Sequence, residues 1–345
     1  MEVGIIGGGN FGTAIANIVG RNGHRTHLWM RDETQVADTL AHGENRRYLP
    51  GHPLPKAVLP TGDLKTAVEN SELLFVSVPS AAFRQVSHRI APLVPSSTGL
   101  VSLTKGIEGD SFLLMSQILA EEVPGHAVGA LSGPNLAEEI ASGHFAGTVI
   151  ASPSAVLASQ VQEALKSATF RVYANTDLYG VELGGALKNI YAIVCGMAAA
   201  LEVGQNTMGM LITRALAEMG RLAVSLGANP LTFLGLAGVG DLLVTCTSPL
   251  SRNYRLGFLV GQGRTLDEAA AELGKLAEGV NTLQVVRQRS RQIEVYMPLV
   301  EGLYQVLFGG QNISVIVREL MTGAQRDDVE FVSPAQWPES EQSDG

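Results

Sequence analysis

The first half of the chain alternates short hydrophobic runs with longer stretches in which hydrophobic and polar positions follow a helical period. Val, Leu and Ile occupy both faces of the short runs, a pattern typical of parallel strands that are buried on both sides of a sheet. We predict strands at residues 3–6, 26–30, 73–78, 100–103, 127–131 and 148–151, and helices at residues 13–22, 33–42, 64–70, 83–91, 112–122 and 136–142. This alternation favours right-handed β–α–β crossovers and a doubly wound sheet.

The alternation stops at two places. Residues 43–60 hold four prolines and two adjacent arginines, and we expect a surface loop there. After a last short run at residues 170–174 the pattern is helical, with helices predicted at residues 178–202, 208–226, 252–260, 280–292, 298–307 and 313–321. The fold class is therefore α/β, with a doubly wound domain over residues 1–175 followed by an all-α domain over residues 176–332. The polar, acidic residues 333–345 are expected to be disordered.

The composition is that of a folded chain with no general affinity for nucleic acid. The 345 residues include 24 Lys and Arg against 33 Asp and Glu, a net charge of −9, and 46% are hydrophobic. The hydrophobic fraction excludes a disordered chain, and the length suits two domains. The acidic balance argues against nucleic acid as a partner, since phosphate backbones are bound by basic surfaces.

The sequence lacks the signs of a secreted, metal-binding or membrane-spanning protein. Cys195 and Cys246 are its two cysteines, so no disulfide framework is expected, and no Cys and His cluster indicates a metal site. The chain begins with a predicted strand rather than a signal peptide, and its longest apolar run, residues 190–201, is about half of a membrane span. We expect a cytoplasmic protein whose apolar helices either pack within their domain or form a homodimer interface.

A glycine-rich segment, G-G-G-N-F-G at residues 7–12, stands between the first predicted strand and the first predicted helix. In the pattern G-x-G-x-x-G, Gly7 makes the tight turn, Gly9 lets the backbone approach a pyrophosphate, and Gly12 lets helix and strand pack closely. The N–H groups that open the helix would bind the anion. The alternative, a glycine-rich turn without a ligand, is weaker in this context. We predict a Rossmann-like domain that binds a dinucleotide.

The end of the second predicted strand bears on which dinucleotide is bound. NAD-selective domains carry an acidic residue there for the ribose 2′-hydroxyl, whereas an arginine accommodates a 2′-phosphate. This chain has Arg31 followed by Asp32. Arg31 indicates tolerance of NADP, unless it is only a solvated charge at the strand end.

Three later segments place ionisable residues among apolar or glycine-rich sequence. Lys105 follows a predicted strand end, where doubly wound domains bind their ligands. Lys188, next to Asn189, stands in an otherwise apolar helix, so it either reaches solvent or lines a cleft. Asp241 lies between glycine and leucines and is costly to bury unless a cation pairs with it. On these residues alone, each lysine is as readily structural as catalytic.

Taken together, the motifs resemble those of the NAD(P)-dependent glycerol-3-phosphate dehydrogenases of the bacterial and plastid type. The resemblance extends from residue 3 to about residue 331 and rests on G-G-G-N-F-G-T-A-I-A, L-T-K-G-I, L-S-G-P-N-L-A, A-L-K-N-I-Y-A-I, G-V-G-D-L-L-V-T-C and S-R-N-Y. It implies reversible hydride transfer between NAD(P)H and dihydroxyacetone phosphate. The product, glycerol 3-phosphate, would supply glycerophospholipid synthesis.

The resemblance also implies roles for individual residues. Lys188 would donate and accept the proton, with Lys105 and Asp241 as further catalytic residues. The substrate would be bound by Lys105, Gly133, Asn135, Lys188, Asn189, Asp241, Thr245, Ser251, Arg252 and Asn253. The coenzyme would be bound by Gly7, Gly9, Asn10, Phe11, Gly12, Arg31, Lys105, Ala137, Arg252, Leu276 and Glu278. Many bacterial members carry Ser or Thr where this chain has Asn135, which can still form a hydrogen bond with the substrate.

The chemistry of these residue types agrees with the implied roles. A lysine can exchange a proton with the C2 oxygen of the substrate if burial and a second cation lower its pKa toward neutrality. An aspartate would orient that lysine, and Arg252 offers a planar fork that matches a phosphate.

Two other functions are compatible with parts of the pattern. A Rossmann dehydrogenase acting on a 3-hydroxyacid or sugar acid could also use a helical lysine followed by asparagine, but the triplet S-R-N favours a phosphorylated substrate. A non-catalytic NAD(P)-sensing module would have no need of Lys105, Lys188 and Asp241 together.

Overall fold

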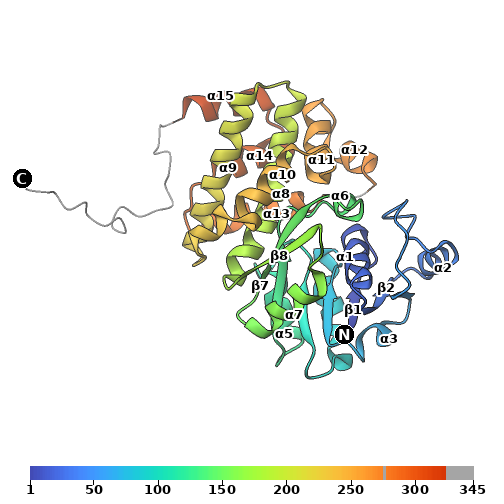
Figure 1. The fold of residues 1–345 in the computed structure, drawn as a ribbon. Coiled ribbons are helices and arrows are strands. Elements are labelled where there is room, and N and C mark those ends of the chain that lie inside the picture. The colour runs from blue at the N-terminus through green and yellow to red at the C-terminus, as the bar shows by residue number, and fades with distance from the viewer. Residues whose placement is uncertain (275–276, 324–345) are drawn as a thin grey trace, which may run out of the picture.

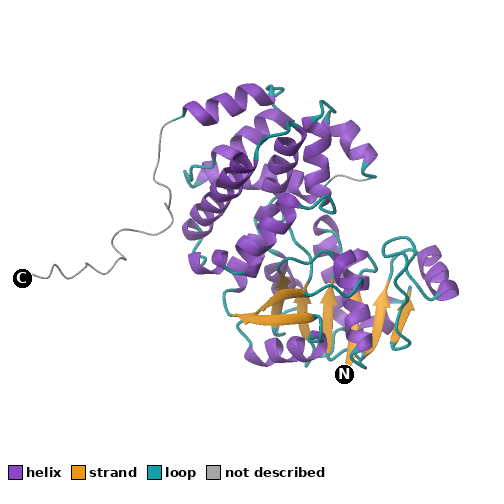
Figure 2. Ribbon diagram, turned by 45° about the horizontal axis from the view of Figure 1, so that its top comes forward, coloured by secondary structure: helices purple, strands orange, loops and turns teal. Residues whose placement is uncertain are grey.

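A computed structural model describes residues 1–274 and 277–323. The N-terminal half is an eight-stranded sheet covered by helices, and the C-terminal half is a group of helices at one end of that sheet (Figures 1 and 2). This arrangement confirms the predicted α/β class with a helical C-terminal region. The expected disorder of residues 333–345 concerns residues outside the described ranges.

The sheet has the strand order β3-β2-β1-β4-β5-β6-β7-β8. Val3 and Ile5 belong to the hydrophobic core on one face, and Ile6 belongs to the core on the other face, so both faces are buried as the hydrophobic runs predicted. The strands are β1 Glu2–Ile6, β2 Arg25–Trp29, β3 Val58–Thr61, β4 Leu73–Val76, β5 Gly99–Ser102, β6 Val128–Ser132, β7 Ala146–Ala151 and β8 Phe170–Asn175.

One pair of strands departs from the expected parallel order. β6 and β7 are antiparallel, with Leu131 opposite Ile150. The connection between them contains α6 (Ala137–Ala141), a helix of five residues. Such a helix spans about 8 Å, whereas a strand of five residues spans about 17 Å. The helix is therefore too short to return the chain to the start of β6, and β7 enters the sheet from the end at which β6 left it.

The helices that cover the sheet mostly follow the predicted pattern. The exception is the helix after β7, which is not among the predicted helices although its buried residues Leu157, Val161 and Leu165 recur at helical spacing. The helices are α1 Asn10–Arg21, α2 Glu33–His42, α3 Leu64–Val68, α4 Ser80–Ile90, α5 Met115–Glu122, α6 and α7 Ala155–Leu165.

The expectation of a surface loop over residues 43–60 is wrong in part. The end of this segment contributes to β3, which pairs with β2 at the outer edge of the sheet. Pro60 is compatible with this place because an edge strand leaves one side of its backbone unpaired. Asn45 and Leu49 are fully buried, so the segment packs against the domain instead of lying in solvent.

The C-terminal half is built around α8 (Leu178–Ala200), which packs against α9, α10, α11, α13 and α14. This helix is long and apolar enough to cross a membrane, but 83% of its most apolar stretch is buried inside the protein, as in the core helix of a globular domain. The others are α9 Gln205–Ser225, α10 Asp241–Thr247, α11 Arg252–Gly261, α12 Leu266–Glu272, α13 Glu278–Gln292, α14 Pro298–Leu307 and α15 Ile313–Thr322. The short helices α10 and α12 are not among those predicted.

The first turns of α8 join the two halves of the molecule. They contact β6 and β7, and the carboxylate of Glu182 accepts hydrogen bonds from the hydroxyl and the backbone N–H of Ser116 (the latter 3.0 Å) at the start of α5. Burial raises the pKa of Glu182 to about 7. Because Lys188 follows less than two helical turns later, this contact sets its position at the end of the sheet.

Candidate active site

The glycine-rich turn has the backbone geometry that the motif requires. Gly7 has φ +123°, and a Cβ atom there would lie 2.2 Å from the carbonyl oxygen of Ser77. A Cβ atom on Gly12 would lie 2.0 Å from the carbonyl oxygen of Gly7, so helix α1 approaches the turn more closely than any other residue would allow. A Cβ atom on Gly9 would meet no atom of the described residues within 4 Å. The two tight positions and the open one correspond to the functions that the spacing predicted.

The N-terminus of α1 is a suitable place for a pyrophosphate. The N-cap of the helix is Gly9, which has no side chain to cap it, and Asn10, the first residue of the helix, is exposed. The N–H groups of a first helical turn have no partner within the helix, and the helix dipole adds a partial positive charge there. Open space at Gly9 next to these groups fits a dinucleotide.

Lys105, Lys188 and Asp241 come together at the carboxyl end of the sheet, although they lie in three distant segments. The Lys105 Nζ donates to Asp241 Oδ2 at 2.6 Å and to the carbonyl oxygen of Gly133 at 3.1 Å. The Lys188 Nζ donates to Asp241 Oδ1 and, at 2.7 Å, to Thr245 Oγ1. Asp241 is 1% exposed, so the prediction that a cation pairs with this buried carboxylate is confirmed.

The environment of Lys188 makes its ammonium group acidic. The pKa of Lys188 is lowered to about 7, mainly because the side chain is buried; the negative charge of Asp241 opposes this shift, and the positive charge of Lys105 adds to it. A lysine with this pKa exchanges protons readily at neutral pH. The expected depression of the pKa by burial and a second cation is therefore present.

The segment before Asp241 explains how the carboxylate reaches the lysines. Residues Leu236–Gly240 form one turn of π-helix, which leads directly into α10. Glycines allow this turn to press against its neighbours, since a Cβ atom on Gly184 of α8 would lie 2.9 Å from the carbonyl oxygen of Ala237. The wider turn thus positions the first residue of α10 against α8. Turns of π-helix are often found at functional sites.

Two buried polar atoms beside this cluster have no hydrogen-bond partner in the described part of the chain. They are the side-chain oxygens of Asn135 and of Ser132, the last residue of β6. The amide of Asn135 donates to Thr148 Oγ1 at 2.9 Å, which fixes its orientation. Unpaired buried polar groups are costly, so both atoms suit a polar ligand. Ser132 is not among the predicted site residues, and its signal in the sequence is a serine that ends a buried strand.

The predicted phosphate-binding triplet opens α11. Ser251 caps this helix by accepting a hydrogen bond from the N–H of Tyr254 at 3.3 Å. Asn253 accepts from the N–H of Gly279 at 2.9 Å and donates to Asn189 Oδ1 at 3.0 Å, so it ties α11 to α13 and α8. The first residue of the helix, Arg252, is exposed and has no ion pair within the described ranges.

The remaining predicted residues that the structure describes lie around the same end of the sheet. Glu278 Oε2, at the start of α13, accepts from Ser80 Oγ at 2.5 Å and thereby links the helical half to α4. Phe11 is half-buried in the first turn of α1, and Ala137 begins α6, which packs against α1. Leu276 lies outside the described residues. Arg31 is exposed in the short connection between β2 and α2.

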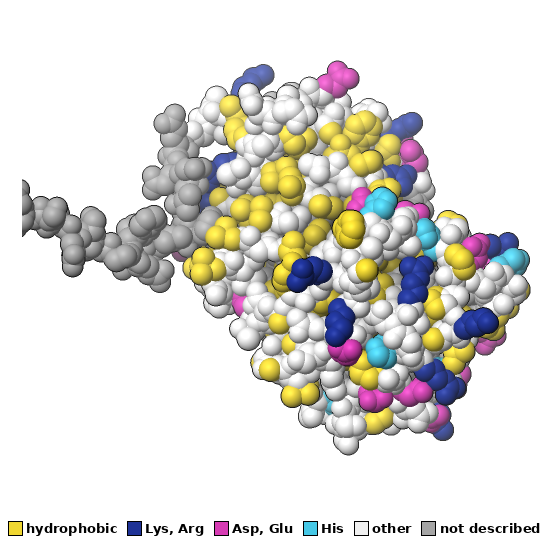
Figure 3. All heavy atoms as spheres, in the orientation of Figure 1, with side chains coloured by type: hydrophobic (Ala, Val, Ile, Leu, Met, Phe, Trp, Pro, Cys, Tyr) yellow, Lys and Arg dark blue, Asp and Glu magenta, His cyan; other side chains and the backbone are white. Residues whose placement is uncertain are grey.

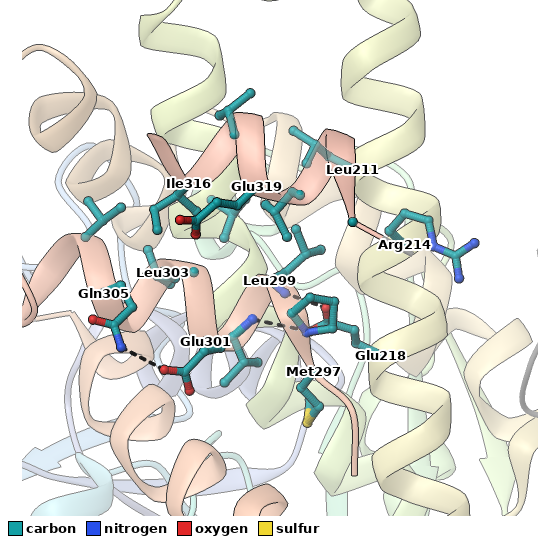
Figure 4. Close-up of a pocket in the computed structure, with 18 of the residues that line it drawn as sticks. Leu211, Arg214, Glu218, Met297, Leu299, Glu301, Leu303, Gln305, Ile316 and Glu319 are labelled. Atoms are coloured by element: carbon teal, nitrogen blue, oxygen red, sulfur yellow. Dashed lines mark hydrogen bonds between the residues drawn. The ribbon is translucent and has the colours of Figure 1, made fainter. Parts of the chain in front are cut away.

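A cavity of about 930 Å³ lies away from this cluster, between α9, α14 and α15 (Figure 4). Its wall is mostly apolar and includes Leu211, Leu299 and Ile316. Glu218 is buried in it and accepts hydrogen bonds from the N–H groups that open α14, the shortest 2.6 Å long from Leu299. Burial raises the pKa of Glu218 to about 7. Since this carboxyl already caps a helix, we interpret its role as structural.

A sheet domain with a glycine-rich dinucleotide turn, followed by a helical domain that holds a buried lysine at the same end of the sheet, defines an NAD(P)-dependent oxidoreductase. The chain belongs to the NAD-dependent glycerol-3-phosphate dehydrogenase family. The model of the N-terminal part of that family matches residues 2–158, and the model of the C-terminal part matches residues 177–318.

Individual relatives match almost the whole chain. Glycerol-3-phosphate dehydrogenase (NAD(P)+) of Pseudomonas syringae pv. syringae is 56% identical over 333 residues, which is 96% of this chain and 97% of that protein. The enzyme of the same name from Teredinibacter turnerae is 54% identical over 331 residues, again 96% and 97% of the two chains. Among solved structures, the glycerol-3-phosphate dehydrogenase of Coxiella burnetii superposes with a TM-score of 0.89 at 36% identity, over 93% of this chain and 99% of that one.

Proposed function

We propose that this protein is a glycerol-3-phosphate dehydrogenase that reduces dihydroxyacetone phosphate with NAD(P)H and provides glycerol 3-phosphate for glycerophospholipid synthesis. Residues 1–175 would form the coenzyme-binding domain and residues 176–332 the catalytic domain. The observation that carries the proposal is the buried Lys188, with a pKa of about 7, bonded to Asp241 at the carboxyl end of the coenzyme-binding sheet. This is where a substrate would meet the nicotinamide.

In the proposed reaction, Lys188 exchanges a proton with the C2 oxygen of the substrate. The bound coenzyme supplies the redox chemistry. Lys188 donates its proton when the ketone is reduced and accepts one when the alcohol is oxidised. Asp241 holds the Lys188 ammonium in place together with Thr245, and Lys105 contributes a second positive charge toward the oxygen that becomes negative.

The substrate would bind between the lysine cluster and the start of α11. Arg252, at the N-terminus of this helix, is suited to the phosphate because its guanidinium has no ion pair with any described residue and the helix dipole also favours an anion. Ser251 and Asn253 would border the phosphate, with Asn189 orienting Asn253. Gly133 and Asn135 would lie on the opposite side, where the side-chain oxygen of Asn135, which has no hydrogen-bond partner among residues 1–274 and 277–323, is available to a substrate hydroxyl.

The coenzyme would run from the glycine-rich turn to the same lysine cluster. Its pyrophosphate would bind at Gly7, Gly9, Asn10, Phe11 and Gly12, and its adenosine end at Arg31. Ala137 would border it as well. Lys105, Arg252, Leu276 and Glu278 are proposed around its nicotinamide end, on the side of the helical domain.

The decisive experiment is a comparison of substrates with purified protein. We expect oxidation of NADH or NADPH with dihydroxyacetone phosphate, and much slower oxidation with 3-oxo acids and with unphosphorylated dihydroxyacetone. Preference for an oxo acid would favour the alternative of a 3-hydroxyacid or sugar-acid dehydrogenase. Coenzyme binding without turnover of any of these would favour a sensing module.

We further propose that the protein works in the cytoplasm as a homodimer formed through the helical half. Apolar side chains gather over that half in Figure 3. Exposed examples beside the cavity are Leu201, Met210, Val317 and Met321. Light scattering during size-exclusion chromatography should give twice the chain mass of 36.4 kDa, and Met210→Glu should reduce it to that of a monomer.

A further inference from the structure

Both carboxylate oxygens of Asp32, which lies between β2 and α2, accept hydrogen bonds from protein groups. Asp32 Oδ1 accepts hydrogen bonds from the N–H and the hydroxyl of Thr34, at 3.0 and 2.6 Å, and so caps α2. Asp32 Oδ2 accepts a hydrogen bond from the Nη1 of Arg47 at 2.8 Å. The bonds from Thr34, with the weaker help of Arg47, hold the pKa of Asp32 below its usual range. Both oxygens that could accept a ribose 2′-hydroxyl therefore have a partner already.

Arg47 is held in this place by the buried start of its segment. Asn45, which is fully buried, donates to the carbonyl oxygen of Gly8 at 2.9 Å and to Thr13 Oγ1 at 2.8 Å. Gln35 of α2 donates to the same Gly8 carbonyl at 2.7 Å. These bonds attach the segment to the glycine-rich turn. Arg47, two residues after Asn45, is thereby positioned beside the turn and beside the end of β2.

The neighbouring arginine, Arg46, forms a similar ion pair with a different residue of α2. Arg46 is bonded to Asp38 in the last turns of α2, whereas Arg47 is bonded to Asp32 before the first turn. The two arginine side chains are similarly exposed, at 47% and 58%. Only one of the two pairs lies at the end of β2, where the 2′ position of an adenosine ribose is recognised in this type of domain. Arg46 is therefore a matched reference for Arg47.

We propose that Arg47 determines coenzyme choice by neutralising Asp32, so that this carboxylate neither selects NAD nor repels the 2′-phosphate of NADP. The proposal rests on the function proposed above, in which NAD(P)H is the coenzyme. It assigns a function to a residue that no motif in the sequence indicated. Arg31 and Arg47 together make the rim of the site positive in spite of Asp32.

Removal of Arg47 should affect the two coenzymes in opposite directions. Without Arg47, Asp32 Oδ2 has no cation beside it, so it can accept a hydrogen bond from the 2′-hydroxyl of NADH, and the carboxylate repels the 2′-phosphate of NADPH. Removal of Asp32 at the same time should cancel both effects. Asp32→Asn is suitable for this purpose because asparagine caps helices as well as aspartate does, so α2 keeps its N-cap.

The test is isothermal titration calorimetry of the full-length protein with NADH and with NADPH, in the absence of substrate. For Arg47→Met we expect the ratio of Kd(NADPH) to Kd(NADH) to rise about tenfold, the effect of about one charge-assisted contact. Arg46→Met should leave the ratio at its wild-type value. The double variant Asp32→Asn, Arg47→Met should return the ratio to within about threefold of the wild type.

Two results would overturn the proposal. Equal ratios for Arg47→Met and Arg46→Met would mean that the pair with Asp32 has no influence on the coenzyme. A raised ratio that Asp32→Asn fails to restore would mean that Arg47 touches the phosphate directly and that neutralisation is not its role. Failure of the proposed function would look different, since it would appear as normal coenzyme binding without reduction of dihydroxyacetone phosphate.

Discussion

The coenzyme turn and the lysine cluster are built in opposite ways. The turn consists of backbone, and its essential residues are glycines, because Gly7 and Gly12 leave no room for a side chain. The cluster consists of side chains, and it keeps the charges of Lys188 and Asp241 out of solvent. A backbone site of this kind is local and needs no perturbed pKa. A side-chain site that moves protons needs burial and neighbouring charge, which only distant segments can provide.

Lys188→Met should give the largest effect, because it removes the proton carrier from the cluster. We expect kcat to fall by about 10²–10⁴-fold, the usual contribution of general acid–base catalysis, with little change in coenzyme Kd. Steady-state kinetics measure kcat, and calorimetric titration measures the coenzyme Kd. Asp241 keeps Lys105 as a partner in the variant, so the fold should persist. A kcat within a few-fold of the wild type would make Lys188 structural and Lys105 the better candidate.

A pair of glycine variants tests whether the turn depends on the backbone alone. Gly12→Ala places a Cβ atom against the Gly7 carbonyl and should destabilise the protein by about 1–3 kcal/mol. Gly9→Ala meets open space, so its free energy of unfolding should be near the wild-type value while its coenzyme Kd rises. Urea denaturation measures the free energy of unfolding of each variant, and titration with NADH measures its coenzyme Kd. Equal losses of stability would contradict the assignment of Gly9 to the ligand.

Arg252→Lys tests whether the exposed guanidinium at the start of α11 recognises the phosphate. Lysine keeps the charge but loses the planar fork, so kcat/KM for dihydroxyacetone phosphate should fall about tenfold or more. Arg255→Lys, on an exposed side chain of the same helix, is the control. Near-wild-type kcat/KM in the Arg252 variant would exclude bidentate binding of the phosphate.

The pH dependence of the two directions should be opposite if Lys188 carries the proton. Its pKa is about 7, so the neutral form needed to oxidise glycerol 3-phosphate increases as the pH rises through 7. The protonated form needed for reduction decreases over the same interval. Between pH 6 and 8 each rate should change about tenfold, as follows for one group of this pKa. Parallel profiles in both directions would speak against a single lysine as donor and acceptor.

Arg31→Ala should have the most selective effect, because it concerns one of the two coenzymes and leaves the chemical step unchanged. Loss of one exposed charge-assisted contact should raise the KM for NADPH by about tenfold while changing the KM for NADH much less. Initial rates at saturating dihydroxyacetone phosphate measure both. The lysine cluster is unaffected, so kcat should stay constant. An equal rise for both coenzymes would mean that Arg31 contacts a part that they share.

The hydrophobic pattern predicts most helices and strands of the structure correctly, but it fails where a strand depends on its pairing with a distant segment. Helix α14 begins and ends as predicted, because its apolar period and its opening proline are both local signals. The edge strand β3 is not among the predicted strands because the prolines of residues 43–60 resemble a loop, and only pairing with β2 makes it a strand. The antiparallel β7 depends on the length of α6, which was expected over residues 136–142 and spans Ala137–Ala141.

The sequence by itself determined the α/β class, the glycine-rich turn and the need for a cation near Asp241, since each follows from a short segment or from the cost of burying one charge. The tertiary structure decided which cations these are, because Lys105 and Lys188 reach Asp241 from elements far apart along the chain. It also decided that Asp32 is paired with Arg47. The lysine cluster depends on the packing of α8 against the sheet, and the pair of Asp32 and Arg47 depends on the packing of residues 43–60. No local sequence pattern encodes such packing between distant segments.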